Sequence, residues 1–309
     1  MKKLAFFLGK GGVGKTTLSS TVAYQMSLQG RKVLIVSLDP AHNLGDVFGK
    51  TLSNDKTSLC RGLDGIEIDL AAWVARYLNE SRDEIRSTYK YNVTINLDSY
   101  MNILKYSPGT EEYAVLWAIE HTYREFKDKY DLIIFDTPPT ALTLRFLAMP
   151  SISLLWVREL SGMREKILSK RQTVMKLNPD AGIIRGSSDK NEDKIYSKLT
   201  GISSRLKGLH RLFTEESYLA VVVNPDNLSV AEALRIRNEL EKLEVIINSV
   251  CLNKAPDEGG CEEKVQSSFR KFPVFTSFLL PGGLHTMEDL GRIHADGVLA
   301  DIQNNARQE

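Results

Sequence analysis

Cysteine is scarce in this sequence. Three cysteines occur in 309 residues (Cys60, Cys251 and Cys261), an odd number without C-x-x-C spacing. Small secreted proteins that depend on disulfides carry many more cysteines in even sets. The count therefore excludes a disulfide framework and favours a reducing compartment.

Net charge and long apolar runs are also lacking. A formal net charge of +1 gives no reason to expect broad binding to nucleic acid or to anionic membranes. No run approaches the 18 apolar residues of a membrane-spanning helix. The first apolar run, residues 4–8, is too short for a signal peptide and stops at glycine, so we expect it to be a buried strand. We expect a cytoplasmic protein that binds no nucleic acid.

A glycine-rich segment between residues 4–8 and a helix-like stretch at 18–28 carries the main signal. It matches G-x-x-x-x-G-K-[ST] and reads Gly9-Lys10-Gly11-Gly12-Val13-Gly14-Lys15-Thr16-Thr17. A strand, a glycine turn and a helix N-terminus direct several backbone N–H groups at one point, which suits a phosphate chain. Lys15 is expected to reach the β- and γ-phosphates and Thr16 to bind Mg²⁺.

The same glycines allow a second interpretation. Gly9, Gly11 and Gly14 also satisfy G-x-G-x-x-G, and Asp39 closes the next strand, as in a dinucleotide-binding fold. The Lys-Thr pair directly after the last glycine is what a triphosphate with Mg²⁺ needs, whereas a pyrophosphate bridge does not. We therefore favour a nucleoside triphosphate site.

The order of apolar segments predicts the fold class. Residues 33–38 form a second, nearly continuous apolar run within about 40 residues of the first, which is typical of a βαβ unit. We expect a doubly wound, mainly parallel α/β sheet with ligands at the carboxyl ends of its strands. A capping box, Ser229 with Glu232, predicts the start of a later helix.

Three aspartates are candidates for catalysis and metal binding. Asp136 ends the apolar strand at residues 132–135 and is expected to contact Mg²⁺ through water. Asp39 is a candidate to orient or deprotonate the attacking water, and Asp46 to hold metal-bound water. The alternative for Asp39 and Asp46 is a cap on the following segment. His42 is interpreted as a structural loop residue.

These motifs resemble those of a known family. The glycine segment resembles the deviant P-loop of NTPases such as MinD, the nitrogenase iron protein and the ArsA ATPases. Residues 39–42, 136–140 and 143–147 are similar to the ArsA arsenite-pump ATPase family and its relative, the targeting factor for tail-anchored membrane proteins. The likeness covers nearly the whole chain and implies a P-loop ATPase domain over residues 1–309.

The resemblance also implies roles for individual residues. Lys10 matches the signature lysine, which contacts the phosphates bound to the opposite subunit of a dimer. Asp39 and Asp136 match the switch I and switch II aspartates, Asn253 the asparagine that reads adenine, and Pro281 a residue near the base. The pump enzymes carry two such halves in one chain, whereas this sequence has one P-loop, so a homodimer is expected.

The sequence departs from both named members of the family. It has no cysteine cluster of the kind that binds metalloid in the pumps. Lys264 stands where the targeting factor has the second cysteine of its zinc-binding C-x-x-C, so we expect no zinc. Leu142 stands where a switch II histidine is expected. ATP hydrolysis with Mg²⁺ is unaffected by these differences.

Two helical regions are predicted between the core strands, at about 71–127 and 150–213, and we expect them to form an inserted subdomain. Six apolar residues recur at helical spacing in the second region: Ile152, Leu155, Trp156, Leu160, Met163 and Ile167. Such a stripe commonly packs into a core. In a targeting factor it would instead line a groove for a membrane-protein segment.

The sequence therefore predicts an ATP-hydrolysing homodimeric switch. Its output is expected to be chaperone-like targeting of hydrophobic membrane-protein segments, with a client segment or a membrane partner as ligand. The alternative is the energy-coupling ATPase subunit of an anion or metalloid (arsenite) exporter. A nucleotide-binding module without turnover is a third possibility.

Overall fold

The computed structural model describes residues 2–41, 43–88, 101, 103–177, 188–256 and 261–305. The chain divides into two compact units. Unit 1 comprises Met1–Phe146 and Glu216–Glu309, and unit 2 comprises Leu147–Glu215. The predicted loop residue His42 lies outside the described residues. Whether the helices of residues 71–127 and 150–213 form one subdomain stays a prediction.

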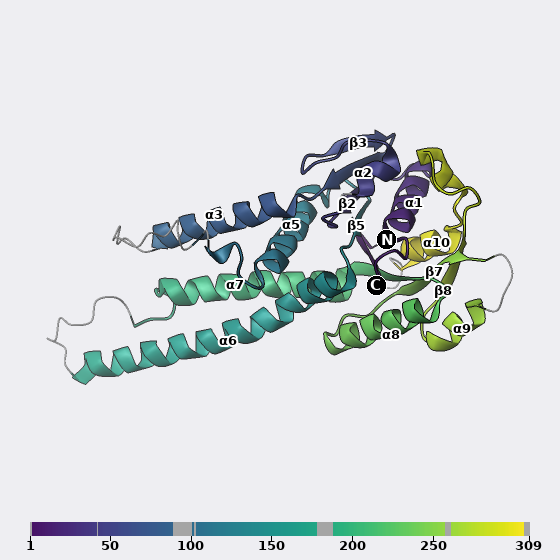
Figure 1. Ribbon diagram of the computed structural model, residues 1–309. Coiled ribbons are helices and arrows are strands. Elements are labelled where there is room, and N and C mark those ends of the chain that lie inside the picture. The colour runs from purple at the N-terminus through teal and green to yellow at the C-terminus, as the bar shows by residue number, and fades with distance from the viewer. Residues whose placement is uncertain are drawn as a thin grey trace. The chain divides into compact units, whose positions relative to one another are not determined.

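Unit 1 is built on an eight-stranded sheet (Figure 1). Its strands are β1 (Leu4–Leu8), β2 (Val33–Ser37), β3 (Thr57–Cys60), β4 (Leu63–Glu67), β5 (Leu132–Asp136), β6 (Ser217–Val223), β7 (Ser249–Ala255) and β8 (Val274–Phe278). The order across the sheet is β3-β4-β2-β5-β1-β6-β7-β8, and only the β3–β4 pair is antiparallel. The prediction of a doubly wound, mainly parallel sheet is confirmed.

Helices cover the faces of this sheet. Unit 1 contains α1 (Lys15–Leu28), α2 (Asn43–Phe48), α3 (Leu70–Thr88), α5 (Thr110–Phe126), α8 (Asn227–Lys242), α9 (Cys261–Ser268), the 3₁₀-helix η2 (Met287–Arg292) and α10 (Asp296–Asn304). On one face, alternate residues of the central strands, such as Phe7 and Ile35, share a buried cluster with Leu18 of α1 and Val298 of α10. On the other face Phe6 stacks on Phe135 at 4.9 Å between ring centroids.

Continuous apolar strands explain why the sheet is covered on both sides. Every residue of β1, β2, β5 and β6 is buried. A strand with one face in water would alternate between apolar and polar residues, so these runs require helices above and below them.

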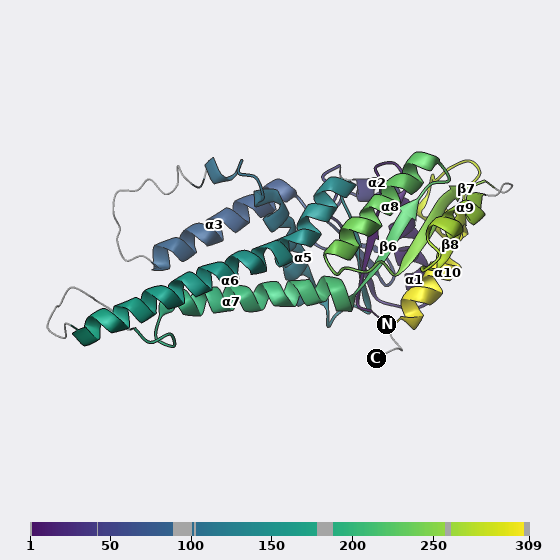
Figure 2. The ribbon, with the colours of Figure 1, turned by 90° about the horizontal axis from the view of Figure 1, so that it is seen from below.

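Unit 2 is helical. Helix α6 (Thr140–Leu177) begins in unit 1 and continues into unit 2, where α7 (Lys194–Arg211) and a short π-helix, η1 (Leu212–Glu216), follow. Figure 2 shows α6 and α7 side by side. Arg164 on α6 makes two hydrogen bonds to Asp193, at 3.0 and 2.6 Å, and Asp193 caps α7 by accepting the Tyr196 N–H.

Helix α6 differs from what the apolar runs predict. By length and composition it could span a membrane: an 18-residue window has a mean hydropathy of 1.4, and 33% of that window is buried. The prediction missed it because Thr, Ser, Pro and Arg residues interrupt the apolar run without lowering its mean hydropathy below this level. Much of the apolar surface of α6 is therefore exposed.

Two local predictions are wrong. Helix α8 starts at Asn227 rather than at Ser229, because the Asp226 side chain is the N-cap and accepts the Ser229 N–H at 2.8 Å. The Ser229 hydroxyl instead accepts the Asn224 N–H. The mostly apolar residues 245–252 predict a strand that ends before Asn253, but β7 runs over Ser249–Ala255, which places Asn253 inside the strand rather than in a loop.

Candidate functional site

Three parallel strands end at one edge of the sheet. Strand β5 lies between β1 and β2, and Asp136 is paired in register with Phe7 of β1 and with Ser37 of β2. The glycine segment follows β1 directly, and Asp39 follows β2. Parallel pairing therefore brings together the segments that the sequence predicts to bind phosphate and metal.

The glycine segment is held tightly at its two ends. Gly9 has φ +151°, and a Cβ there would lie 2.5 Å from the Val222 carbonyl oxygen of β6. Gly14 has φ +91° and immediately precedes α1. Between them Val13 is buried and joins the apolar cluster beneath the loop. A side chain at either glycine would displace the turn that leads into the helix N-terminus.

Lys15 is the first residue of α1 and is buried. Its Nζ atom lies 3.5 Å from the Lys10 carbonyl oxygen. Burial lowers the pKa of Lys15, while the charges of Asp136 and Asp39 oppose that shift. The ammonium group is thus kept inside the cradle and close to two carboxylates, where a phosphate chain would give it a stronger partner.

Thr16 and Asp136 form the part of the site that suits a metal ion. The Thr16 hydroxyl donates a 2.6 Å hydrogen bond to Oδ2 of Asp136. The other carboxylate oxygen, Oδ1, is buried and has no hydrogen-bond partner among the described residues. Burial raises the pKa of Asp136 to about 6, and the Thr16 bond and Lys15 oppose that rise. A hydroxyl and a carboxylate with an unused oxygen fit a hard cation such as Mg²⁺.

No cluster of three or more His, Cys, Asp or Glu side chains that could hold a metal occurs in the described part of the chain. A cation held by Thr16 and Asp136 would therefore take its other ligands from phosphate and water, as Mg²⁺ commonly does at nucleotide sites. The geometry fits a metal that arrives with the nucleotide.

The remaining candidate aspartates differ in position. Asp39 is half-buried, and its charge acts on both Lys15 and Asp136. Its Oδ1 also accepts the Ala41 N–H at 3.0 Å, which is the bond that the capping interpretation predicts. Asp46 lies exposed on α2. Asp39 therefore lies at the edge of the sheet where the glycine segment begins. Catalytic roles for Asp39 and Asp46 stay predictions.

Two residues that the resemblance assigns to the base lie in different settings. Asn253 is buried, and its amide Nδ2 donates to the Val13 carbonyl oxygen at 2.8 Å. Pro281 is exposed in a turn after β8. The Gly283 N–H closes this turn by donating to the Leu280 carbonyl oxygen. The structure brings Asn253 onto the glycine segment itself, and reading of adenine stays a prediction for both residues.

Sequence reasoning missed two residues of this site. The Lys254 ammonium group donates to the Gly12 carbonyl oxygen at 3.0 Å. The buried Thr137 hydroxyl donates to the Phe7 carbonyl oxygen at 2.6 Å and so ties the end of β5 to β1. The signal available in the sequence was an Asn-Lys pair directly after an apolar run, at the end of a strand where parallel sheets bind ligands.

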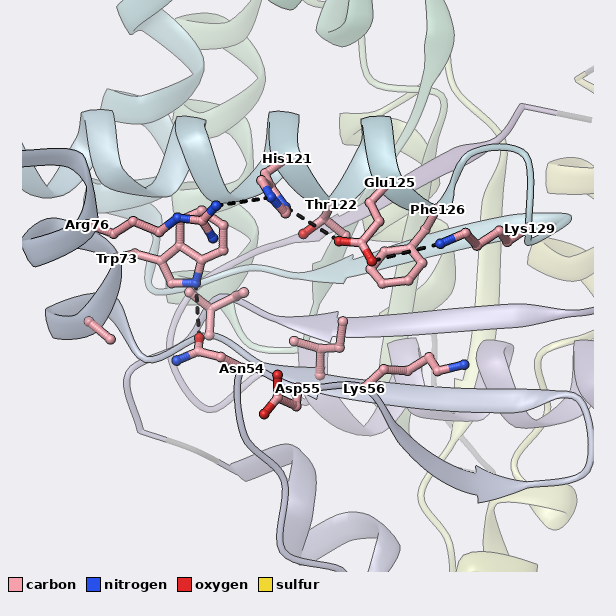
Figure 3. A pocket seen from close by; sticks show the side chains of 13 residues that line it. Asn54, Asp55, Lys56, Trp73, Arg76, His121, Thr122, Glu125, Phe126 and Lys129 are labelled. Atoms are coloured by element: carbon pink, nitrogen blue, oxygen red, sulfur yellow. Dashed lines mark hydrogen bonds and ion pairs between the residues drawn. The ribbon is translucent and has the colours of Figure 1, made fainter. Parts of the chain in front are cut away.

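A separate hollow of about 420 Å³ lies in unit 1 beside α3 and α5 (Figure 3). The Trp73 indole N–H donates to Asn54 at 3.0 Å, and an Arg76 nitrogen lies 3.3 Å from His121. Glu125 is paired with His121 at 3.7 Å and with Lys129 at 3.8 Å. Arg76, His121, Glu125 and Lys129 are therefore linked with one another, and none of the predicted nucleotide residues lines the hollow.

Fold and site together define a P-loop nucleoside triphosphatase with a deviant glycine segment. The family of anion-transporting ATPases known as ArsA ATPases matches residues 2–273, and the chain belongs to this family. It is an ATP-hydrolysing enzyme whose substrate is a nucleotide.

Its similarity extends to relatives with two kinds of name. A protein of Aquifex aeolicus whose name describes an arsenical pump-driving ATPase is 33% identical over 263 residues, covering 84% of this chain and 83% of its own. The ATPase GET3 of Candida tropicalis is 32% identical over 287 residues, which cover 85% of this chain and 76% of its own. The ATPase get3 of Schizosaccharomyces japonicus is 29% identical over 259 residues, with 82% and 74% covered.

Proposed function

We propose that this ATPase is a cytoplasmic, homodimeric switch that uses Mg·ATP to control the binding of a hydrophobic client segment on α6. Mg²⁺ would lie between the Thr16 hydroxyl and the Asp136 carboxylate, where it would neutralise charge on the phosphates. Lys15 would hold the phosphate chain, and Asp39 would orient the attacking water. The unpartnered Oδ1 of Asp136 supports the metal assignment.

Lys10 supports the dimeric part of the proposal. Its ammonium group makes no hydrogen bond or ion pair with any residue that the structure describes, although its carbonyl oxygen accepts from Lys15. A cation at the rim of the cradle without a partner in its own chain is available to phosphates bound in a second copy. Hydrolysis would then depend on closure of the two subunits.

The exposed apolar face of α6 is the observation that carries the client assignment. All six residues of the predicted stripe are exposed, among them Trp156 at 67% and Leu155 and Met163 at 58% each. The opposite side of the same helix is buried, with Leu168 at 2%. The stripe is therefore a surface rather than a core face, and exposed apolar patches of this kind mark binding sites.

The length of this face indicates what would occupy it. From Ile152 to Ile167 the stripe covers about 22 Å of helix axis, at about 1.5 Å per residue. The exposed residues Val174 and Leu177 extend it to roughly 38 Å. An apolar helix of about 20 residues, the length that spans a membrane, is about 30 Å long and fits this range. We commit to such a segment as the client.

The exporter alternative is favoured by the names of the Aquifex aeolicus relatives but not by the described thiols. Burial raises the pKa of the Cys251 thiol to about 12, so it stays protonated inside β7. Cys60 lies on β3 at the far edge of the same sheet. A soft metalloid needs thiolates that converge on it, and these two do not.

The test compares two doubly charged variants of the same helix. Leu155→Glu with Leu160→Glu places two carboxylates in the apolar face, whereas Ser169→Glu with Gln172→Glu places them at exposed polar positions. Binding of a fluorescent apolar helix of about 20 residues is measured by anisotropy, and ATP hydrolysis is measured without peptide. We expect about a tenfold loss of peptide affinity in the first variant only. Unchanged peptide affinity in the first variant, or equal losses in both, would refute the client assignment.

A further inference from the structure

The end of β7 holds the glycine segment by two adjacent carbonyl oxygens. Asn253 donates through Nδ2 to Val13 at 2.8 Å, and Lys254 donates through Nζ to Gly12 at 3.0 Å. The two donors are consecutive in sequence, as are the two acceptors, although about 240 residues separate them. Each of the two carbonyl oxygens therefore accepts a hydrogen bond from its own side-chain donor.

The backbone of β7 is distorted where these contacts are made. The pairing register between β7 and β8 shifts between Leu252 and Ala255, which is the stretch that contains both donors. Lys254 also has φ +56°, a left-handed conformation that side chains other than glycine rarely adopt. Bulges re-aim side chains near functional sites. Here the distortion directs two successive side chains toward the same loop, which a regular strand would not do.

The outer part of the glycine segment has little other support. A Cβ added at Gly11 or Gly12 would meet no atom within 4 Å. At Gly14, in contrast, a Cβ would lie 2.3 Å from Nδ2 of Asn253. The loop is therefore anchored by its own buried residue Val13 and packed against β7 at one side. The space around its tip, Gly11 and Gly12, is open. Lys254 is the residue that reaches that tip.

We propose that Lys254 is a positioning residue which, together with Asn253, sets the phosphate loop in its binding shape before nucleotide arrives. In a trans peptide the carbonyl and the following N–H point in opposite directions. Holding the Gly12 and Val13 carbonyl oxygens toward β7 therefore turns the N–H groups of Val13 and Gly14 away from β7, where that of Val13 donates to the Lys10 carbonyl oxygen at 3.5 Å within the loop. Pre-set N–H groups bind a phosphate chain without the entropic cost of ordering the loop.

This inference rests on the proposal that nucleotide lies in residues 9–17. Lys254→Met keeps the length of the side chain without its donor, and Lys254→Arg restores a donor. Lys254→Gly removes the donor and also relieves the left-handed backbone. Glu244→Gly is the matched control, because Glu244 has φ +61° and is exposed.

Two measurements are made on the full-length protein. The first is the dissociation rate of fluorescent ADP and of a non-hydrolysable ATP analogue. We expect dissociation to be about five- to tenfold faster for Lys254→Met and Lys254→Gly, and near the wild-type rate for Lys254→Arg and Glu244→Gly. The second is hydrogen exchange at residues 11–14 without nucleotide, which should be faster in the same two variants.

The outcomes separate this inference from the proposed function. Unchanged exchange and unchanged dissociation in Lys254→Met would overturn it. An increase in dissociation rate that is larger for the ATP analogue than for ADP would also overturn it. A direct charge contact scales with phosphate charge, whereas an effect on loop shape does not. If wild-type protein bound no nucleotide, the proposed function would fail, while exchange in nucleotide-free protein would still decide whether Lys254 braces the loop.

Discussion

At the scale of single residues, Gly14 combines a left-handed backbone with close packing. A methyl group there would meet Asn253 at 2.3 Å while φ stays at +91°. We expect Gly14→Ala to cost about 1 to 3 kcal/mol of stability and to abolish nucleotide binding. Gly30→Ala is the control, since Gly30 has φ +82° with no atom within 4 Å of the added Cβ. Urea unfolding and ADP titration of both variants check this prediction. Equal effects in the two variants would show that the left-handed backbone alone, and not the contact with Asn253, causes the losses.

The Thr16 hydroxyl contacts a buried carboxylate. It donates to Asp136, whose pKa burial already raises to about 6. Thr16→Val keeps the shape of the side chain but removes the proposed metal ligand and a hydrogen bond to a buried carboxylate. We expect Mg²⁺ to lose its effect on nucleotide affinity and turnover to fall by about 100-fold, while ADP still binds in chelator. Thr16→Ser, which keeps the hydroxyl, should retain the Mg²⁺ effect; a Thr16→Val enzyme with normal Mg²⁺ dependence would contradict the assignment.

At the scale of elements, one carboxylate joins α6 to α7 within unit 2. Asp193 accepts from Arg164 and caps α7, and its side chain is 7% exposed. The Arg164 guanidinium lowers the pKa of Asp193, so this stabilisation is complete at neutral pH and is lost as pH falls below the usual aspartate range. We expect Asp193→Ala to cost on the order of 3 kcal/mol at neutral pH.

The same substitution should cost much less in acid, because the wild-type carboxylate is then protonated. Thermal unfolding at neutral and acidic pH measures the difference. Lys190→Ala is the control: its ion pair with Glu165 is about half exposed on both sides, so its loss should destabilise the protein much less. An equal cost of Asp193→Ala at both pH values would show that packing, rather than charge, holds the helix pair.

At the scale of the whole molecule, the proposed switch requires a second copy. We expect Lys10→Ala to weaken formation of the closed dimer with a non-hydrolysable ATP analogue and to lower turnover by at least about tenfold, while ADP affinity changes little. Light scattering with and without the analogue, together with ADP titration, measures both effects. If ADP affinity fell as much as dimer formation, Lys10 would act within its own subunit and the shared site would be wrong.

Local patterns predicted the fold because its main determinants are local. An apolar run such as residues 132–135 has to be buried on both faces, and a glycine turn before a helix has few uses other than anion binding. The placement of Thr16 against Asp136 followed from parallel strands that end at one edge. Ser229 was misassigned as a cap because Asp226, three residues earlier, offers the same chemistry, and only geometry chooses between them.

The sequence by itself determined the class of enzyme, the parallel sheet and the phosphate loop, because motif chemistry and apolar periodicity act over short stretches of chain. Only the tertiary structure decided that the α6 stripe faces outward and that Lys254 reaches Gly12. Whether an apolar helix face is covered depends on what packs there, and a lysine finds its acceptor only after a strand bulge has aimed it. Both are contacts between segments that are far apart in sequence, and residue patterns along one stretch do not encode them.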